Sequence, residues 1–203
     1  MKRVFLLAAV CLAGITSSHA QRFINGIGTG VFVEGASHTN TKASTVFTYS
    51  PRISFAESEN TSISVGIPLS VGFSATYNAT YDSYYGWDEE SMFGYMVNAP
   101  VMVNFNFGAG SAQGCQSRMG FYVGAGYGLH AGTVESEYYD PEYYGYYTDS
   151  RSMATTGPAA NIGMRIGVGR KKRHNIEIST FYMKGITGDY KAHIGGLTCL
   201  FNF

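Results

Sequence analysis

The sequence predicts an all-β chain that folds as an eight-stranded antiparallel up-and-down transmembrane β-barrel. The first observation is a strict alternation over residues 62–77, where every odd position is apolar or aromatic and every even position is Ser, Gly, Pro or Thr. The same alternation returns over residues 93–107, again with the apolar residues at odd positions. A period of two is typical of a β-strand. Small residues on one face suit a crowded interior, so we expect the large apolar face to point outward into lipid.

The first twenty residues predict a secretory signal peptide. Lys2 and Arg3 precede an apolar run, and the sequence Ser18-His19-Ala20 forms a small-x-small cleavage site. Cleavage after Ala20 would leave a single barrel domain over residues 21–203. An alternative lipoprotein anchor at Cys11 is disfavoured, because the branched Val10 precedes it where a small residue is needed.

Composition narrows the function classes. Loss of Lys2 and Arg3 lowers the 14 basic residues to 12, against 14 acidic residues, so the mature chain has a net charge of −2. This balance gives no support for binding of nucleic acid. No mature segment reaches 18 consecutive apolar residues, which argues against a transmembrane helix.

Eight strands follow in order along the chain. The expected strands lie at about 23–36, 47–55, 62–77, 93–107, 120–132, 158–168, 176–182 and 193–203. Polar loops are expected over 78–91 and 135–151, and short turns near 57–59 and 169–173. Because the long loops fall at one end and the short turns at the other, we expect the loops outside the cell and the turns in the periplasm. Two outward aromatic girdles are expected: Phe23, Phe55, Phe105, Phe107, Phe121, Phe201 and Phe203 at the turn end, and Phe47, Tyr77, Phe93, Tyr95 and Tyr182 at the loop end.

The last strand carries a family resemblance. Residues 195–203 have apolar side chains at alternate positions back from a terminal Phe203, with Phe201 two positions before it. This pattern resembles the C-terminal assembly signal of bacterial outer-membrane barrels. With the signal peptide, the chain resembles the small OmpA/OmpX-like outer membrane protein β-barrel domain family. The resemblance implies insertion into outer-membrane lipid by the barrel-assembly machinery, and it implies no single activity. Cys199 departs from the usual aliphatic or aromatic residue.

Several charged residues have the parity of the barrel interior. We expect a lumen network of Glu34, Arg52, Arg165, Glu177 and His130, with Arg118 also pointing inward. Arg165 and Glu177 are each six residues from Lys171, so a hairpin centred there places them opposite each other as an ion pair. The network is either an ion path or a polar plug, and the narrow interior of eight strands favours the plug.

No catalytic or metal-binding constellation is recognisable. His38, His130, His174 and His193 fall on a loop, in the lumen, in a turn and on the outer face, so none shares a serine and a carboxylate. No metal-ligand spacing and no cofactor motif occur, and Cys115 and Cys199 are expected to remain unpaired. We therefore expect no enzyme. The basic run at 170–173 is assigned to solvation or contact with anionic headgroups.

The two long loops are the candidate recognition surface. Each carries a net charge of −4 and is rich in aromatic residues. Tyr offers a large amphipathic contact area at low entropic cost, so this composition suits binding of an extracellular or host partner that is basic or glycan-like. An aromatic lid or girdle is the alternative. The candidate recognition residues are Tyr84, Tyr85, Trp87, Tyr138, Tyr139, Tyr143, Tyr144, Tyr146 and Tyr147.

The sequence thus predicts a structural or adhesive outer-membrane barrel. Two alternatives stay open at this point. One is a narrow pore for small solutes, and the other is a lipid-modifying outer-membrane enzyme built on His130 or His193.

Overall fold

The computed structural model describes the backbone of residues 22–36, 41–82, 86–140, 145–169, 174–188 and 191–203. Side chains are described for these residues except 75–92 and 135–149. The signal peptide and His38 therefore lie outside the described residues. No helix in the described part of the chain is long and apolar enough to cross a membrane.

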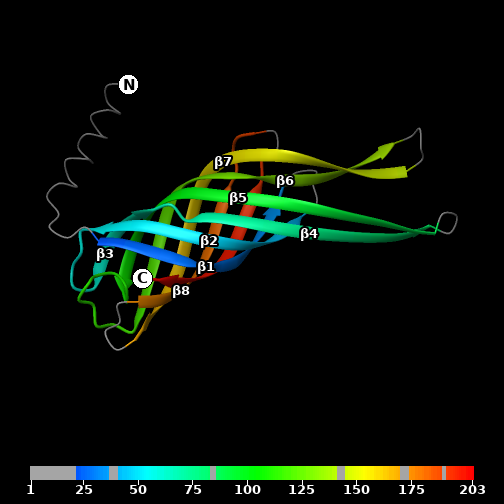
Figure 1. Ribbon diagram of the computed structural model, residues 1–203. Coiled ribbons are helices and arrows are strands. Elements are labelled where there is room, and N and C mark those ends of the chain that lie inside the picture. The colour runs from blue at the N-terminus through cyan, green and yellow to red at the C-terminus, as the bar shows by residue number, and fades with distance from the viewer. Residues whose placement is uncertain (1–21, 37–40, 83–85, 141–144, 170–173, 189–190) are drawn as a thin grey trace, which may run out of the picture.

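An antiparallel sheet closes on itself to form the barrel (Figure 1). Its ring closes because β1 pairs with both β2 and β9. The strands are β1 (Arg22–Gly35), β2 (Lys42–Phe55), β3 (Thr61–Gly66), β4 (Leu69–Asp82), β5 (Gly86–Gly108), β6 (Met119–Asp140), β7 (Gly145–Val168), β8 (His174–Lys184) and β9 (His193–Asn202).

β3 and β4 are two halves of one barrel strand, so the expected eight-stranded ring is confirmed. Both halves pair with β2 on one side and β5 on the other, in one continuous register. The interruption falls at Ile67 and Pro68. Pro68 has no backbone N–H to donate to a ladder, whereas the N–H of Ile67 still donates to the carbonyl oxygen of Pro51 at 3.1 Å.

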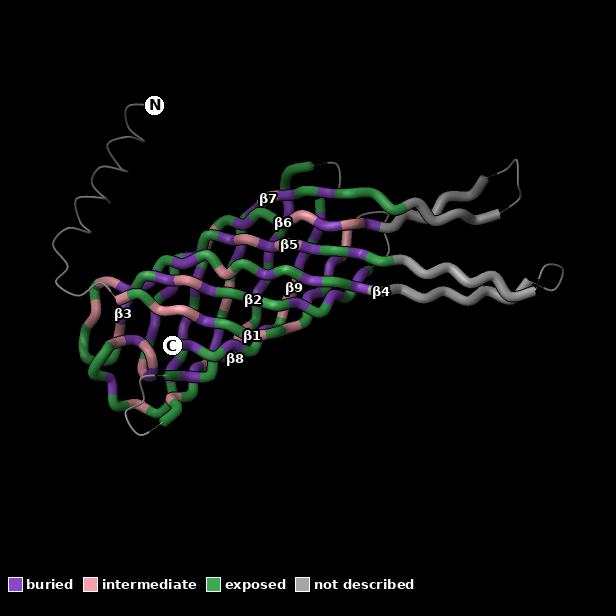
Figure 2. Tube along the Cα trace, viewed as in Figure 1, coloured by how far each residue is buried: buried purple, intermediate pink, exposed green. Residues whose placement is uncertain are grey.

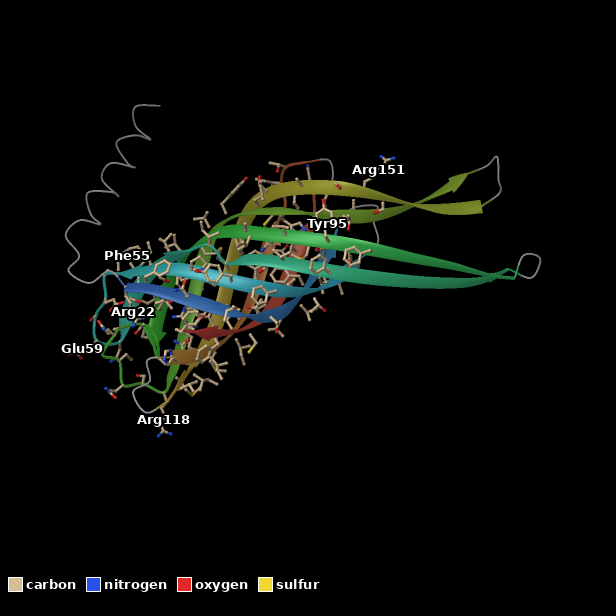
Figure 3. The ribbon with its side chains drawn as sticks, in the orientation of Figure 1. Arg22, Phe55, Glu59, Tyr95, Arg118 and Arg151 are labelled. Carbon is tan, nitrogen blue, oxygen red and sulfur yellow. The ribbon has the colours of Figure 1, made fainter. Side chains whose placement is uncertain are left out.

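Buried and exposed residues alternate along the strands, as Figure 2 shows. The exposed positions carry the large apolar side chains, for example Val101 and Ile162, at 48% and 61% exposure. The buried positions carry mostly Ser, Thr, Asn, Gly and charged residues. The predicted facing is therefore correct for the side chains of the strands that the structure describes. The exception is Arg118, which is exposed and points away from the barrel (Figure 3). It precedes β6, so strand parity does not constrain its side chain.

The two expected long loops are instead extensions of the strands. β4 and β5 stay paired up to Asp82 opposite Gly86, and β6 and β7 up to Asp140 opposite Gly145. The prediction of loops over 78–91 and 135–151 was wrong for the described parts of these ranges. Both hairpins project from the same end of the barrel (Figure 1). We call them the β4–β5 hairpin and the β6–β7 hairpin.

The opposite end holds the β2–β3 and β5–β6 connections and the C-terminus (Figure 1). The backbone groups of Phe203 and Asn25 bond reciprocally here, at 2.8 and 3.1 Å, and fasten the last residue beside β1. Phe201 and Phe203 are both exposed on the outer face. At the turn end the exposed aromatic side chains include Phe23, Phe105, Phe107 and Phe121. At the hairpin end they include Phe73, Phe93, Tyr95 and Tyr182. Phe55 is half-buried, and the side chain of Tyr77 lies outside the described residues.

Candidate functional site

The barrel lumen holds two clusters of charged residues with apolar side chains between them. Arg52, Arg165 and Glu177 lie near the turn end of β2, β7 and β8. Glu34 and Lys42 lie at the hairpin end of β1 and β2, directly opposite each other in the ladder. We call these sets the turn-end cluster and the hairpin-end cluster.

Glu177 is the centre of the turn-end cluster. The structure places it opposite Arg165, as the hairpin centred on Lys171 predicts. Its Oε2 atom accepts from Nε of Arg165 and from Nη1 of Arg52, each at 2.8 Å. Its Oε1 atom accepts from the hydroxyl of Tyr122 at 2.7 Å. All four side chains are buried, so one carboxylate joins strands β2, β6, β7 and β8.

Asparagines complete the coordination of the two guanidinium groups. Arg165 donates from Nη1 to Oδ1 of Asn106 at 2.9 Å, and Arg52 donates to Oδ1 of Asn202. Asn202 also donates to Oε2 of Glu177 at 2.9 Å. The guanidinium carbon of Arg165 lies 4.4 Å from the ring centroid of Tyr122, which adds a cation–π contact. A buried charge is tolerated when it is paired and hydrogen-bonded in this way.

An apolar layer separates the two clusters. Phe32, Met96 and Met183 are at most 2% exposed, and the rings of Phe32 and Phe181 lie 5.8 Å apart. Glycines make room for these side chains, since a Cβ on Gly128 would lie 2.6 Å from Sδ of Met183. Between this layer and the turn-end cluster lies a cavity of about 40 Å³ lined by residues that include Arg52, Tyr122 and Phe181. Side chains thus fill the lumen, as expected for a barrel of this size.

The hairpin-end cluster contains the remaining expected lumen residues. Nε2 of His130 lies 3.2 Å from Oε2 of Glu34, and neither side chain is more than 4% exposed. The ammonium of Lys42 donates to Oγ1 of Thr133 at 2.7 Å. The structure therefore divides the five predicted lumen residues between two sites, with Arg52, Arg165 and Glu177 in one and Glu34 and His130 in the other.

Sequence parity missed several members of these clusters. Tyr122, Asn106 and Asn202 have inward parity, but parity gives no information about which residues meet across the lumen. Lys42 falls between the expected strands at 23–36 and 47–55, although it continues the inward parity of Ser44 and Thr48. That parity was the signal from which the inward position of Lys42 could have been predicted.

His174 and His193, the other histidines in the described part of the chain, lie on the outside. The hydroxyl of Tyr182 and Nδ1 of His193 are 2.7 Å apart on the outer face, and the ring of His174 stacks on Phe201. Neither ring nitrogen of the buried His130 makes a hydrogen bond, although Nε2 lies 3.2 Å from Oε2 of Glu34. Among the described residues, no group of three or more His, Cys, Asp or Glu side chains could hold a metal ion.

The candidate recognition residues belong to the two hairpins. Tyr84, Tyr85, Tyr143 and Tyr144 lie outside the described residues. The backbone register pairs Tyr81 with Trp87 in one hairpin. In the other it pairs Tyr138 with Tyr147 and Tyr139 with Tyr146.

Comparison with known proteins supports the barrel fold. The crystal structure of Neisserial surface protein A (NspA) matches with a TM-score of 0.55 at 10% identity, over 91% of this chain and 98% of that one. Ail, the attachment invasion locus protein of Yersinia pestis, matches with a TM-score of 0.49 at 14% identity, over 90% and 98%. The N-terminal β-barrel domain of Pseudomonas aeruginosa OprF gives 0.38 at 16% identity, over 90% and 100%.

The expected resemblance to small OmpA/OmpX-like barrels is thus confirmed at the level of the fold, by the match to NspA. No protein-family model and no curated protein matches the sequence.

Proposed function

We propose that this chain is an integral β-barrel of the bacterial outer membrane, exported by a signal peptide that is cleaved after Ala20. The support is the inverted arrangement of the barrel, with apolar side chains outside and charged side chains inside. In lipid, such a closed barrel pairs its backbone groups while it presents only apolar surface to the acyl chains. Insertion would involve the barrel-assembly machinery acting on the C-terminal strand. To test the location, the outer-membrane fraction is purified and run on gels with and without heating. We expect the protein in this fraction, with a mobility that changes on heating as the barrel unfolds.

We propose further that the protein is no enzyme and acts as a structural or surface-binding protein. The observation that carries this role is the pair of hairpins that extend from one end of the barrel. Residues 78–91 and 135–151 each carry a net charge of −4. Paired strands hold such residues in a more defined arrangement than free loops would. The surface that results suits an extracellular or host partner that is basic or glycan-like.

The register of β6 and β7 shows where the β6–β7 hairpin can be shortened to test this role. Glu137 lies opposite Thr148, so residues 138–147 can be replaced by Asn-Gly, which favours the tight turn that joins two antiparallel strands. We expect cells that carry this variant to lose attachment to matrix-coated and glycan-coated surfaces. The barrel should still fold, because its ladder bonds lie below the truncation.

A second variant distinguishes the contribution of the tyrosines from that of the acidic residues. Replacing the six tyrosines between 138 and 147 with serine keeps every acidic residue. Loss of attachment in both variants supports recognition by the tyrosines. Attachment that is unchanged by the truncation on all surfaces would refute the adhesive role, and a barrel that fails to fold would show that the hairpin is structural.

A further inference from the structure

The two hairpins diverge at a defined point in the sheet. The β5–β6 ladder ends at Met96 opposite Gly132. Beyond it, β5 continues only with β4, and β6 continues only with β7. The carbonyl oxygen of Tyr95 lies beside this last pair, since a Cβ on Gly132 would lie 2.9 Å from it. We call this point the fork.

The ammonium of Lys42 occupies the fork. It donates to Oγ1 of Thr133 at 2.7 Å and to the carbonyl oxygen of Thr133 at 3.1 Å. It also reaches the carbonyl oxygen of Tyr95 at 3.5 Å. Thr133 is the first residue of β6 above the last β5–β6 pair, and Tyr95 is the corresponding residue of β5. One side chain therefore contacts the base of both hairpins.

The lumen around Lys42 is shaped to admit it. The side chain starts on β2 and passes Gly94 of β5. A Cβ on Gly94 would lie 2.3 Å from Nζ and 2.6 Å from Cε of Lys42. Lys42 is only 9% exposed, and its neighbour in the ladder is the buried Glu34. A buried ammonium with several oxygen partners is a rigid anchor. If the ammonium moved away, its charge and the carbonyl oxygens would stay buried without partners, which is unfavourable.

From this geometry we infer that Lys42 fixes the angle between the β4–β5 hairpin and the β6–β7 hairpin. It is a positioning residue for the surface that the hairpins present. This inference rests on the proposed recognition role for its biological meaning, but the effect on geometry stands independently. Without the ammonium, the carbonyl of Tyr95 and the carbonyl of Thr133 lose a shared donor, and β5 and β6 are free to separate further.

The test measures the distance between the hairpins directly. Spin labels are placed at Ala79→Cys and Ser136→Cys, one in each hairpin, with Cys115 and Cys199 replaced by serine. Pulsed electron spin resonance on the barrel in nanodiscs then gives the distribution of label separations. We expect Lys42→Met to broaden and shift this distribution. Gly94→Ala should have the same effect, because it leaves the lysine in place and displaces its ammonium.

Matched controls exclude general loosening. Lys184→Met removes an exposed lysine, and Gly195→Ala adds a Cβ that meets nothing within 4 Å. Both should leave the distribution at the parental width. An unchanged distribution in folded Lys42→Met barrels would overturn the inference. A changed distribution with undiminished attachment to coated surfaces would instead overturn the recognition role while the positioning role survives. If Lys42→Met does not fold, Gly94→Ala decides by the same measure.

Discussion

At the scale of single residues, the turn-end cluster is governed by an imbalance of charge. Arg52 and Arg165 share Glu177 as their carboxylate partner. Nε of Arg52 and Nη2 of Arg165 have no hydrogen-bond partner in the structure. Removing an arginine therefore leaves a balanced pair, whereas removing the carboxylate leaves two buried cations side by side.

This asymmetry predicts an order of stabilities. Glu177→Gln should lower the free energy of unfolding by about 3–5 kcal/mol, the usual loss when one partner of a buried ion pair is removed. Arg165→Met should cost less, because Arg52 still neutralises Glu177. Urea titration of the barrel in lipid bilayers measures both. Equal losses for the two variants would contradict the shared-carboxylate arrangement.

A double variant tests how the residues are coupled. Arg165→Met combined with Glu177→Gln leaves Arg52 without a carboxylate, so this pair of changes is not expected to be neutral. Adding Arg52→Met to it should recover part of the lost stability. Simple additivity across the three sites would show that they do not interact.

At the scale of the strands, alternation was sufficient to predict which side chains of each strand point into the barrel. It was sufficient because one face of every barrel strand is exposed and carries the large apolar side chains, whereas the other meets a packed interior. The hairpin extensions lack this contrast, so residues 78–82 and 135–140 read as polar loops although they are paired strands. Likewise, the partners of Glu177 could be predicted only where a neighbouring strand supplies them. Arg165 was found from its hairpin register, but Arg52 meets Glu177 across the lumen.

The facing of the strands gives a prediction of its own. Val101 is outward and paired with Tyr127 in the middle of β5 and β6. Val101→Arg should lower the free energy of unfolding in bilayers by about 2–4 kcal/mol if the site lies at the bilayer midplane. Ser70→Thr, inside the lumen beside the cavity, serves as a matched control with a mild effect. A Val101→Arg barrel as stable as the parent would mean that this face does not meet lipid.

At the scale of the whole molecule, the order of layers along the lumen bears on transport. An ion that enters at the turn end meets Arg52, Glu177 and Arg165, and then the apolar layer that contains Phe32 and Met183. The small cavity between them is bounded by these layers. An ion that crosses the apolar layer would have to lose its water, and transfer of a bare charge into such surroundings is strongly unfavourable.

We therefore expect the parent protein to show no steady conductance in planar bilayers. Widening the apolar layer with Phe32→Ala and Phe181→Ala should produce measurable currents, because these two rings contact each other within the layer. The outer-face variant Phe93→Ala, which removes a ring exposed to lipid, should stay silent. Steady currents through the parent would show that the layer opens in the membrane, and the barrel would then have to be treated as a narrow pore.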